Sequence, residues 1–115
     1  AKHGVAGICD QVMASAFHQI GEKWSCSEID VYQERRGCEI ALRVLYELRR
    51  VIPQGDPRFI AIGGTLQGDQ YSIPPTMAEL VVRDAGWHSV SLGTSLPVSS
   101  FLKAIDETKA QMLWL

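Results

Sequence analysis

The 115-residue sequence has almost no excess charge of either sign, few cysteines and no long apolar run. Its net charge is −2 and its pI is near 5.9, whereas modules that bind nucleic acid usually carry a strongly basic face. No apolar run approaches the roughly 20 residues that a membrane-spanning helix needs. These absences argue against a nucleic-acid-binding module and against a membrane protein.

Several motifs are also missing. Cys9, Cys26 and Cys38 are odd in number and show no C-x-x-C spacing, so neither a disulfide framework nor a structural zinc site is expected. Free thiols suit a reducing compartment, and no signal peptide opens the sequence, which together predict a cytoplasmic protein.

Neither G-x-G-x-x-G nor a Walker G-K-[ST] motif is present, which disfavours a nucleotide site. No nucleophile stands beside a base, so we do not expect an enzyme.

The first half of the sequence reads as helix. Hydrophobic residues make up 46% of the chain, and in the first half they recur at helical spacing. One helix is predicted to run from Val5 and to stop at Gly21. A second is predicted to begin at the N-cap residue Asp30 and to end before Pro53. We therefore expect residues 1–52 to form a helical subdomain, followed by the turn-forming linker "PQGDP".

The second half alternates strand and helix. A βαβαβ order predicts an α/β fold with a parallel, flavodoxin-like (Rossmann-like) sheet and right-handed crossovers. Three strands make half of such a sheet, so we expect a truncated α/β domain at residues 58–115 that belongs to a larger protein. The predicted strands are 58–64, 88–93 and 111–115, and the predicted helices are 74–86 and 97–109.

Two loops are candidates for binding a ligand. Ligands of doubly wound sheets bind beyond the carboxyl ends of the strands, and the loops 63–75 and 93–97 occupy that position. Gly63, Gly64 and Gly68 allow a close approach of the backbone. These loops are therefore the predicted ligand site.

Nearly the whole chain resembles a known family. Its stretch "WSCSEIDVYQER" (24–35) keeps Trp24, Glu28 and Glu34 in the register of the run W-x-x-G-E-I-x-V-x-x-E-H. The stretch "DAGWHSVSLGTSLP" (84–97) is similar to the second strand and following loop of the same family. This family is the cobalamin-binding domain of MerR-type light-responsive repressors and of the corrinoid modules of methionine synthase and methyltransferases. The resemblance implies a macrocycle held between the helical part, as its upper cap, and the strand ends.

The resemblance breaks at the metal ligand. Where the family has D-x-H-x-x-G, this chain has Asp69-Gln70-Tyr71-Ser72-Ile73-Pro74, so Tyr71 stands at the position of the cobalt-ligating histidine. A phenol with a pKa of ~10 binds a metal only as phenolate, as a ferric haem iron can enforce. Tyr71 is therefore either a metal ligand or a packed, hydrogen-bonded loop residue. Pro74 replaces a glycine that lets the corrinoid tail pass close to the backbone.

The resemblance implies a set of cofactor-binding residues. Trp24 would stack on the corrin ring, and Glu34 would hydrogen-bond a ligand amide or hydroxyl. Plain structural roles stay open for both, as a cap between the helices for Trp24 and as a helix-surface residue for Glu34. The full predicted set is Trp24, Glu34, Asp69, Tyr71, Gly93, Thr94 and Ser95, with Tyr71 as the candidate metal ligand.

Three functions are consistent with these residues. The first is the sensor domain of a MerR-type transcription regulator with cobalamin, or else haem, as effector and without ligation by histidine. The second is a ligand-free dimerisation or protein-interaction domain of the same fold. The third is a corrinoid carrier subunit of a methyltransferase. The resemblance further implies a homo-oligomer that contacts DNA only through a domain outside this segment.

Overall fold

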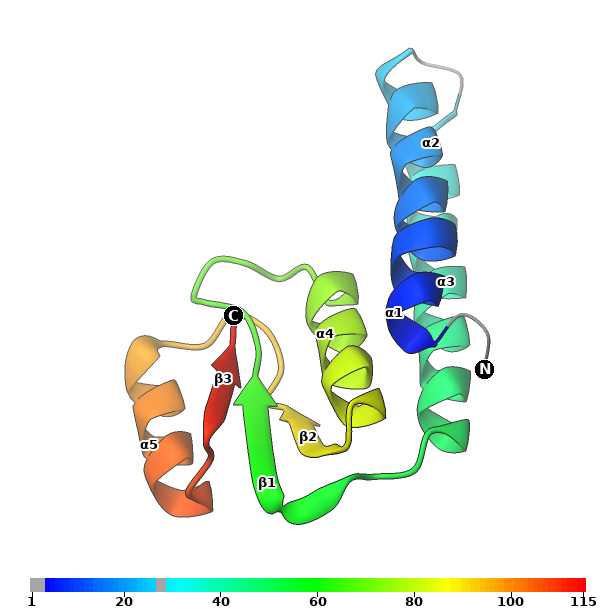
Figure 1. The fold of residues 1–115 in the computed structure, drawn as a ribbon. Helices are drawn as coiled ribbons and strands as arrows, with labels where there is room; N and C mark the ends of the chain where they lie inside the picture. Colours follow the sequence, from blue (N-terminus) through cyan, green and yellow to red (C-terminus); the bar gives the residue numbers. More distant parts are fainter. Residues whose placement is uncertain (1–3, 27–28) are drawn as a thin grey trace.

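A computed structural model gives the fold of the chain (Figure 1). It describes residues 4–26 and 29–115, and of residue 24 it describes only the backbone. The helical elements are α1 (Val5–Ile8), the π-helical turn η1 (Cys9–Met13), α2 (Ala14–Ser25), α3 (Val31–Val51), α4 (Ile73–Asp84) and α5 (Val98–Thr108). The strands are β1 (Asp56–Gly63), β2 (Trp87–Ser91) and β3 (Met112–Trp114).

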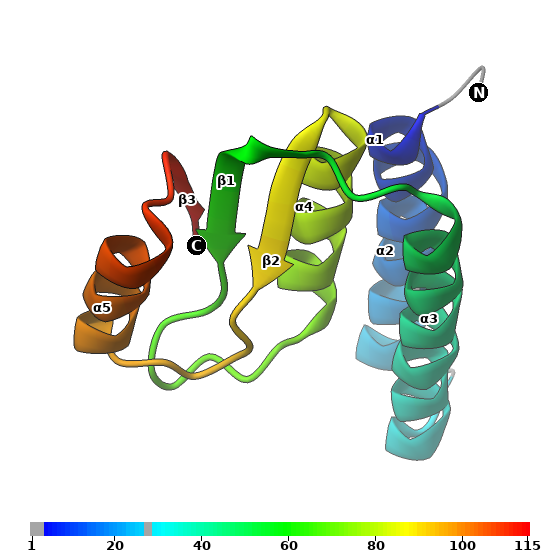
Figure 2. The ribbon, with the colours of Figure 1, turned by 90° about the horizontal axis from the view of Figure 1, so that it is seen from below.

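The three strands form one parallel sheet in the order β2-β1-β3. Helices α4 and α5 lie on opposite sides of this sheet (Figures 1 and 2). The prediction of an α/β fold with parallel strands is therefore confirmed, and the strand order is consistent with a doubly wound, flavodoxin-like sheet. The first strand begins at Asp56, two positions earlier than predicted, because Asp56 already pairs with Trp87 of β2; the register then shifts between Asp56 and Ile60.

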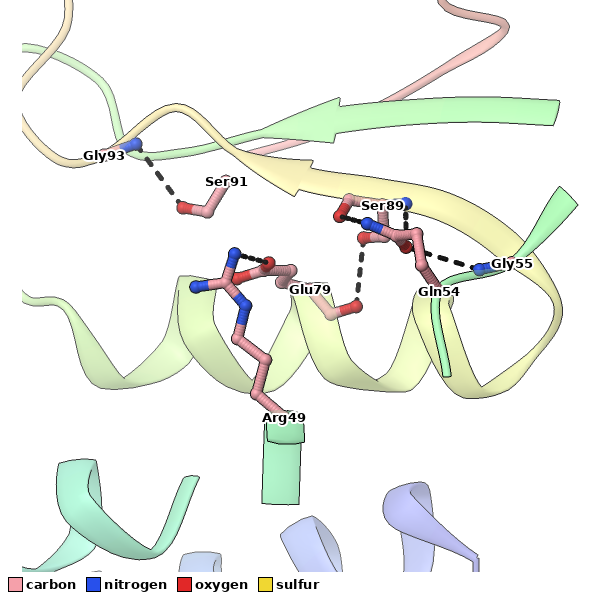
Figure 3. Close-up of polar contacts among 7 residues, drawn as sticks. All are labelled: Arg49, Gln54, Gly55, Glu79, Ser89, Ser91 and Gly93. Atoms are coloured by element: carbon pink, nitrogen blue, oxygen red, sulfur yellow. Dashed lines mark hydrogen bonds and ion pairs between the residues drawn. The ribbon is translucent and has the colours of Figure 1, made fainter. Parts of the chain in front are cut away.

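The linker before β1 is tied to β2 by the side chain of Gln54 (Figure 3). The Ser89 N–H donates to Gln54 Oε1 at 3.1 Å, and Gln54 Nε2 donates to the Ser89 carbonyl oxygen at 3.3 Å. The Ser89 hydroxyl, which is fully buried, donates to the Glu79 carbonyl oxygen of α4 at 2.9 Å. The Gln54 amide thus provides the hydrogen-bond partners of the Ser89 N–H and carbonyl groups in β2. Buried polar groups need such partners.

The first helix does not stop at Gly21. The helical run from α1 through η1 continues to the end of α2 at Ser25. A glycine ends a helix when it adopts a positive φ, as in a C-terminal cap, and the positive-φ glycines of the described residues are Gly68, Gly86 and Gly93. The prediction of a helix end at Gly21 is therefore wrong. A glycine inside a helix costs only about 1 kcal/mol relative to alanine, a cost that packing against α3 can offset.

The first helical run (α1, η1 and α2) and α3 form a helical hairpin. This hairpin packs on the outer side of α4, and the two share one apolar core. Helix α3 begins after Asp30, whose N–H donates to Gln33 Oε1 at 2.8 Å, and it ends before Pro53 as predicted. Its buried positions are joined in one apolar cluster with residues of the first helix and of α4. The cluster contains Val5, Cys9, Met13, Ala41, Leu45, Ile52, Ile73 and Leu80. The segments 1–52 and 58–115 are therefore held together by one common core.

The hairpin also reaches beyond the sheet. Figure 1 shows α2 and the first half of α3 rising past the carboxyl ends of the strands, where the loop before α4 begins. This overhang brings α3 close to one of the two loops predicted to bind a ligand. Within residues 4–26 and 29–115, no helix is long and apolar enough to cross a membrane.

An ion pair between a buried carboxylate and a half-exposed arginine accompanies the apolar core between α3 and α4. Glu79 of α4 is only 2% exposed, and Arg49 Nη2 of α3 lies 3.3 Å from its Oε1 (Figure 3). Among the described residues no hydrogen bond is directed at this oxygen, so the contact is ionic. Burial raises the pKa of the Glu79 carboxyl, and the guanidinium groups of Arg49 and Arg83 oppose this effect.

Replacing Arg49 tests this ion pair. We expect Arg49→Met to lower the free energy of unfolding at neutral pH by about 1–2 kcal/mol, because it removes the ion-pair partner of a buried carboxylate. The raised pKa of Glu79 means that the folded state holds the proton more tightly, so stability falls as the pH rises through that pKa. The loss in Arg49→Met should therefore shrink near pH ~4, where the carboxyl is protonated.

Urea unfolding monitored by circular dichroism at the two pH values measures this effect. The matched control is Arg50→Met, which removes an arginine whose side chain is 76% exposed in the next position of α3. An equal loss of stability in both variants, or a loss in Arg49→Met that does not depend on pH, would contradict the account.

Candidate functional site

The two loops at the carboxyl ends of β1 and β2 are bonded to each other. The Ser95 N–H donates to Thr65 Oγ1 at 2.8 Å and to the Asp69 carbonyl oxygen at 3.0 Å. The Gly68 N–H donates to Ser95 Oγ at 3.1 Å, and the Thr65 hydroxyl donates to the Asp69 carbonyl oxygen. Thr65 is only 5% exposed and lies at the centre of these contacts. These hydrogen bonds hold the two loops against each other.

Glycines allow the loop backbones to touch. A Cβ atom on Gly64 would lie 2.6 Å from the Gly93 carbonyl oxygen, and one on Gly63 would lie 2.0 Å from the ring of Trp114. Larger residues would therefore push apart the strand ends. Gly93 has a φ of +109° and Ser95 a φ of +57°, so the second loop turns sharply before α5.

Tyr71 points from the first loop to α3. Its hydroxyl lies 3.9 Å from Cys38 Sγ, which is within hydrogen-bonding distance for sulfur. The Cys38 thiol also donates to Glu34 Oε1 at 3.5 Å, and the other oxygen of Glu34 lies 3.3 Å from Arg35 Nη1. This chain of contacts joins Tyr71 of the loop to Glu34 on the helical hairpin.

A small cavity opens beside this contact. It has a volume of about 200 Å³ and is open to solvent. Pockets that enclose a drug-sized ligand usually measure ~300–1,000 Å³, so this one has room for a small polar molecule or for the edge of a larger one. Its lining residues are Arg35, Cys38, Glu39, Leu42, Gln70, Tyr71, Ser72 and Ile73.

The Tyr71 hydroxyl and the Cys38 thiol keep their protons at neutral pH. The pKa of the Tyr71 hydroxyl is raised, first by burial and then by the contact with Cys38 and by the charge of Glu34. The pKa of the Cys38 thiol is also raised, again chiefly by burial. A neutral phenol and a neutral thiol are hydrogen-bonding groups, whereas metal ligation needs the phenolate or the thiolate.

These residues do not fit a corrinoid or a haem bound through Tyr71. The hydroxyl of Tyr71 is directed at Cys38 and is protonated. Asp69, which would orient the metal ligand, instead accepts a hydrogen bond from the Tyr71 backbone N–H at 3.0 Å. The backbones that would line the tail of a corrinoid touch at Gly64 and Gly93. Such a ligand would have to displace the contacts described above.

The predicted site residues fall into two groups. Asp69, Gly93 and Ser95 meet in the loop network, whereas Glu34 and Tyr71 meet through Cys38. Thr94 is half-buried in the second loop. Trp24 belongs to α2, but its side chain lies outside the described residues, as does Glu28. Among the described residues, no group of three or more His, Cys, Asp or Glu side chains could hold a metal ion.

Sequence reasoning missed two residues that organise the site. The sequence identifies Cys38 only as a thiol without C-x-x-C spacing, and its contact with Tyr71 depends on how α3 is placed against the loop. Thr65 follows Gly63 and Gly64 directly, and a hydroxyl at the end of a buried strand is a signal that could have identified it. Arg35 and Gln70 were likewise not predicted to share a cavity.

Comparison with known proteins gives no assignment. No protein-family model matches the chain, and no curated protein matches it.

Replacing Tyr71 tests the environment of its hydroxyl. We expect Tyr71→Phe to remove a component of the alkaline absorbance titration that ionises above the usual tyrosine pKa of ~10. Because the folded state holds this proton more tightly, the native protein should lose stability as the pH rises through the raised pKa. This part of the loss should be absent in Tyr71→Phe.

A matched control is Tyr32→Phe, which removes a tyrosine that is 62% exposed on α3. The late component should persist in this control. If it persists equally in Tyr71→Phe, the hydroxyl is not held against Cys38 as described.

Proposed function

We propose that this chain is a regulatory, non-enzymatic module related to the cobalamin-binding domains of MerR-type regulators, and that it works as a protein-interaction domain without a tetrapyrrole. In this proposal a direct contact between the helical hairpin and the loop takes the place that a ligand has in the family. The module would transmit regulation through contacts with other protein segments. DNA would be bound by a part of the protein outside this sequence.

The contact between Tyr71 and Cys38 carries this proposal. The resemblance puts a metal-ligating histidine at position 71, and the tyrosine found there is bonded to α3 at 3.9 Å. Its neighbour Asp69 is engaged with the loop backbone. The side chain of Tyr71 is 48% exposed, so this contact lies at the surface, where it joins the loop directly to α3.

A second candidate function is a sensor with cobalamin or haem as effector. The cavity beside Cys38 and Tyr71 supports it, because this space opens at the junction between the helical hairpin and the strand ends, where the resemblance puts the macrocycle. In this alternative the macrocycle would displace the contact between Tyr71 and Cys38. When bound, it would supply a coloured, light- or redox-sensitive metal centre.

A corrinoid carrier subunit is the weakest of the three candidates. Methyl transfer would need an imidazole to tune the cobalt, and position 71 offers a protonated phenol. A homo-oligomer, which the resemblance implies, stays a prediction that light scattering on the purified protein can measure. A cytoplasmic location likewise stays a prediction.

An absorption spectrum distinguishes the two leading candidates. We expect no shift of the visible bands when the purified protein is mixed with hydroxocobalamin or with haemin, because the loop contacts leave the metal without a ligand. We also expect no vitamin in protein expressed with cobalamin supplied. Stoichiometric cobalamin, or a haem band shift, would overturn the proposal in favour of the sensor.

The variant Tyr71→Phe is the control for the metal ligand. It keeps the ring but removes the hydroxyl. If the native protein shifts the haemin spectrum and Tyr71→Phe does not, the phenol of Tyr71 is a metal ligand, and the protein-interaction proposal is wrong.

A further inference from the structure

One face of α3 is apolar and exposed. Ile40, Val44 and Val51 follow one another at spacings of four and seven residues, so they form a single row along the helix. Their exposed fractions are 53%, 44% and 75%. An open groove of about 440 Å³ is lined by Val44, Leu48 and Val51 together with Arg43 and Glu47. We call this surface the α3 seam, defined by Ile40, Val44, Leu48 and Val51.

The seam is bordered on one side by arginines. Arg36, Arg43 and Arg50 recur every seven residues, which places them in a second row next to the seam. Arg50 is paired with Glu47, whose Oε2 lies 3.1 Å from its Nη1. Among the described residues no carboxylate lies within 4.0 Å of Arg36 or Arg43. Glu47 also lines the groove, so the seam has an apolar centre and a rim of three arginines and one glutamate, with a net positive charge.

This distribution of charge identifies the kind of partner that fits. In paired helices the residues that flank the apolar row determine partner choice through opposite charges. A second copy of α3 would bring the same arginines and Glu47, the carboxylate that lines the groove. Glu47 is already paired with Arg50 of its own chain, so among the described residues the groove of a second copy has no free carboxylate to offer.

We propose that the α3 seam is a docking site for an amphipathic helix that carries acidic residues beside its apolar face. This inference rests on the proposed function as a protein-interaction domain and names its partner by chemistry. The seam and its rim extend from Arg36 to Val51, about 22 Å at a rise of 1.5 Å per residue. The partner helix therefore has at least four turns, with glutamate or aspartate facing Arg36 and Arg43.

A pair of synthetic peptides tests the inference on the full chain. One three-heptad peptide carries leucine at its apolar positions and glutamate beside them, and the other carries lysine in place of each glutamate. Like charges keep each peptide from pairing with itself. We expect the glutamate peptide to bind with at least about tenfold higher affinity than the lysine peptide, as measured by fluorescence anisotropy.

Substitutions in the seam show where the peptide binds. Val44→Glu should weaken binding of the glutamate peptide at least about tenfold, because it places an unpaired charge in the apolar row. The matched control is Val12→Glu, at a valine that is 59% exposed on η1, and it should bind as the native protein does.

The double variant Arg36→Glu/Arg43→Glu should reverse the preference and bind the lysine peptide better. Lys103→Glu, an exposed cation on α5, is the control for charge.

Three results would overturn the inference. The first is equal binding of the two peptides, which would show that the arginines of the rim do not favour an acidic partner over a basic one. The second is no binding of either peptide by protein whose circular dichroism is native. The third is a dimer, seen by light scattering, that Val44→Glu dissociates, which would assign the seam to a second copy. The third result would leave the proposed function intact, whereas a tetrapyrrole spectrum would overturn that function without testing the seam.

Discussion

The apolar packing of the helical hairpin on α4 determines how the hairpin lies against the α/β layer. Leu45 of α3 and Leu80 of α4 are both fully buried, and they share one cluster with Val5, Cys9 and Met13 of the first helix. Burial of each such side chain contributes about 1.5–3 kcal/mol. This core positions α3 so that Cys38 contacts Tyr71 of the loop before α4. It also leaves the α3 seam exposed to solvent.

The same packing explains why the site differs from what the family resemblance implies. A hairpin that acts as a cap over a ligand would need space between itself and the strand ends. Here the hairpin is fixed to α4 through Leu45 and the Arg49–Glu79 ion pair, and α3 reaches the loop through Tyr71. A protonated phenol at this position stabilises the junction between the layers, and it leaves the loop without the imidazole that a corrinoid would use.

The sequence allowed the elements to be predicted better than the contacts between them. Local signals such as Asp30, the prolines at the start of α4 and the apolar strand runs depend on neighbouring residues, so the α/β order was predictable. The predicted helix end at Gly21 was wrong because a glycine permits a helix to end but does not require it to. The contact of Cys38 with Tyr71 joins residues 33 positions apart, and periodicity contains no information on such a pairing.

Because one core joins the helical hairpin to α4, the hairpin and the α/β layer should open together as one unit. Native-state hydrogen exchange at increasing denaturant tests it most directly. We predict that the amides of Leu45 in α3 and of Leu80 in α4 exchange with the same free energy and the same dependence on denaturant. Exchange of the α3 amides through a smaller opening, while Leu80 stays protected, would show a hairpin that opens on its own and would contradict the account.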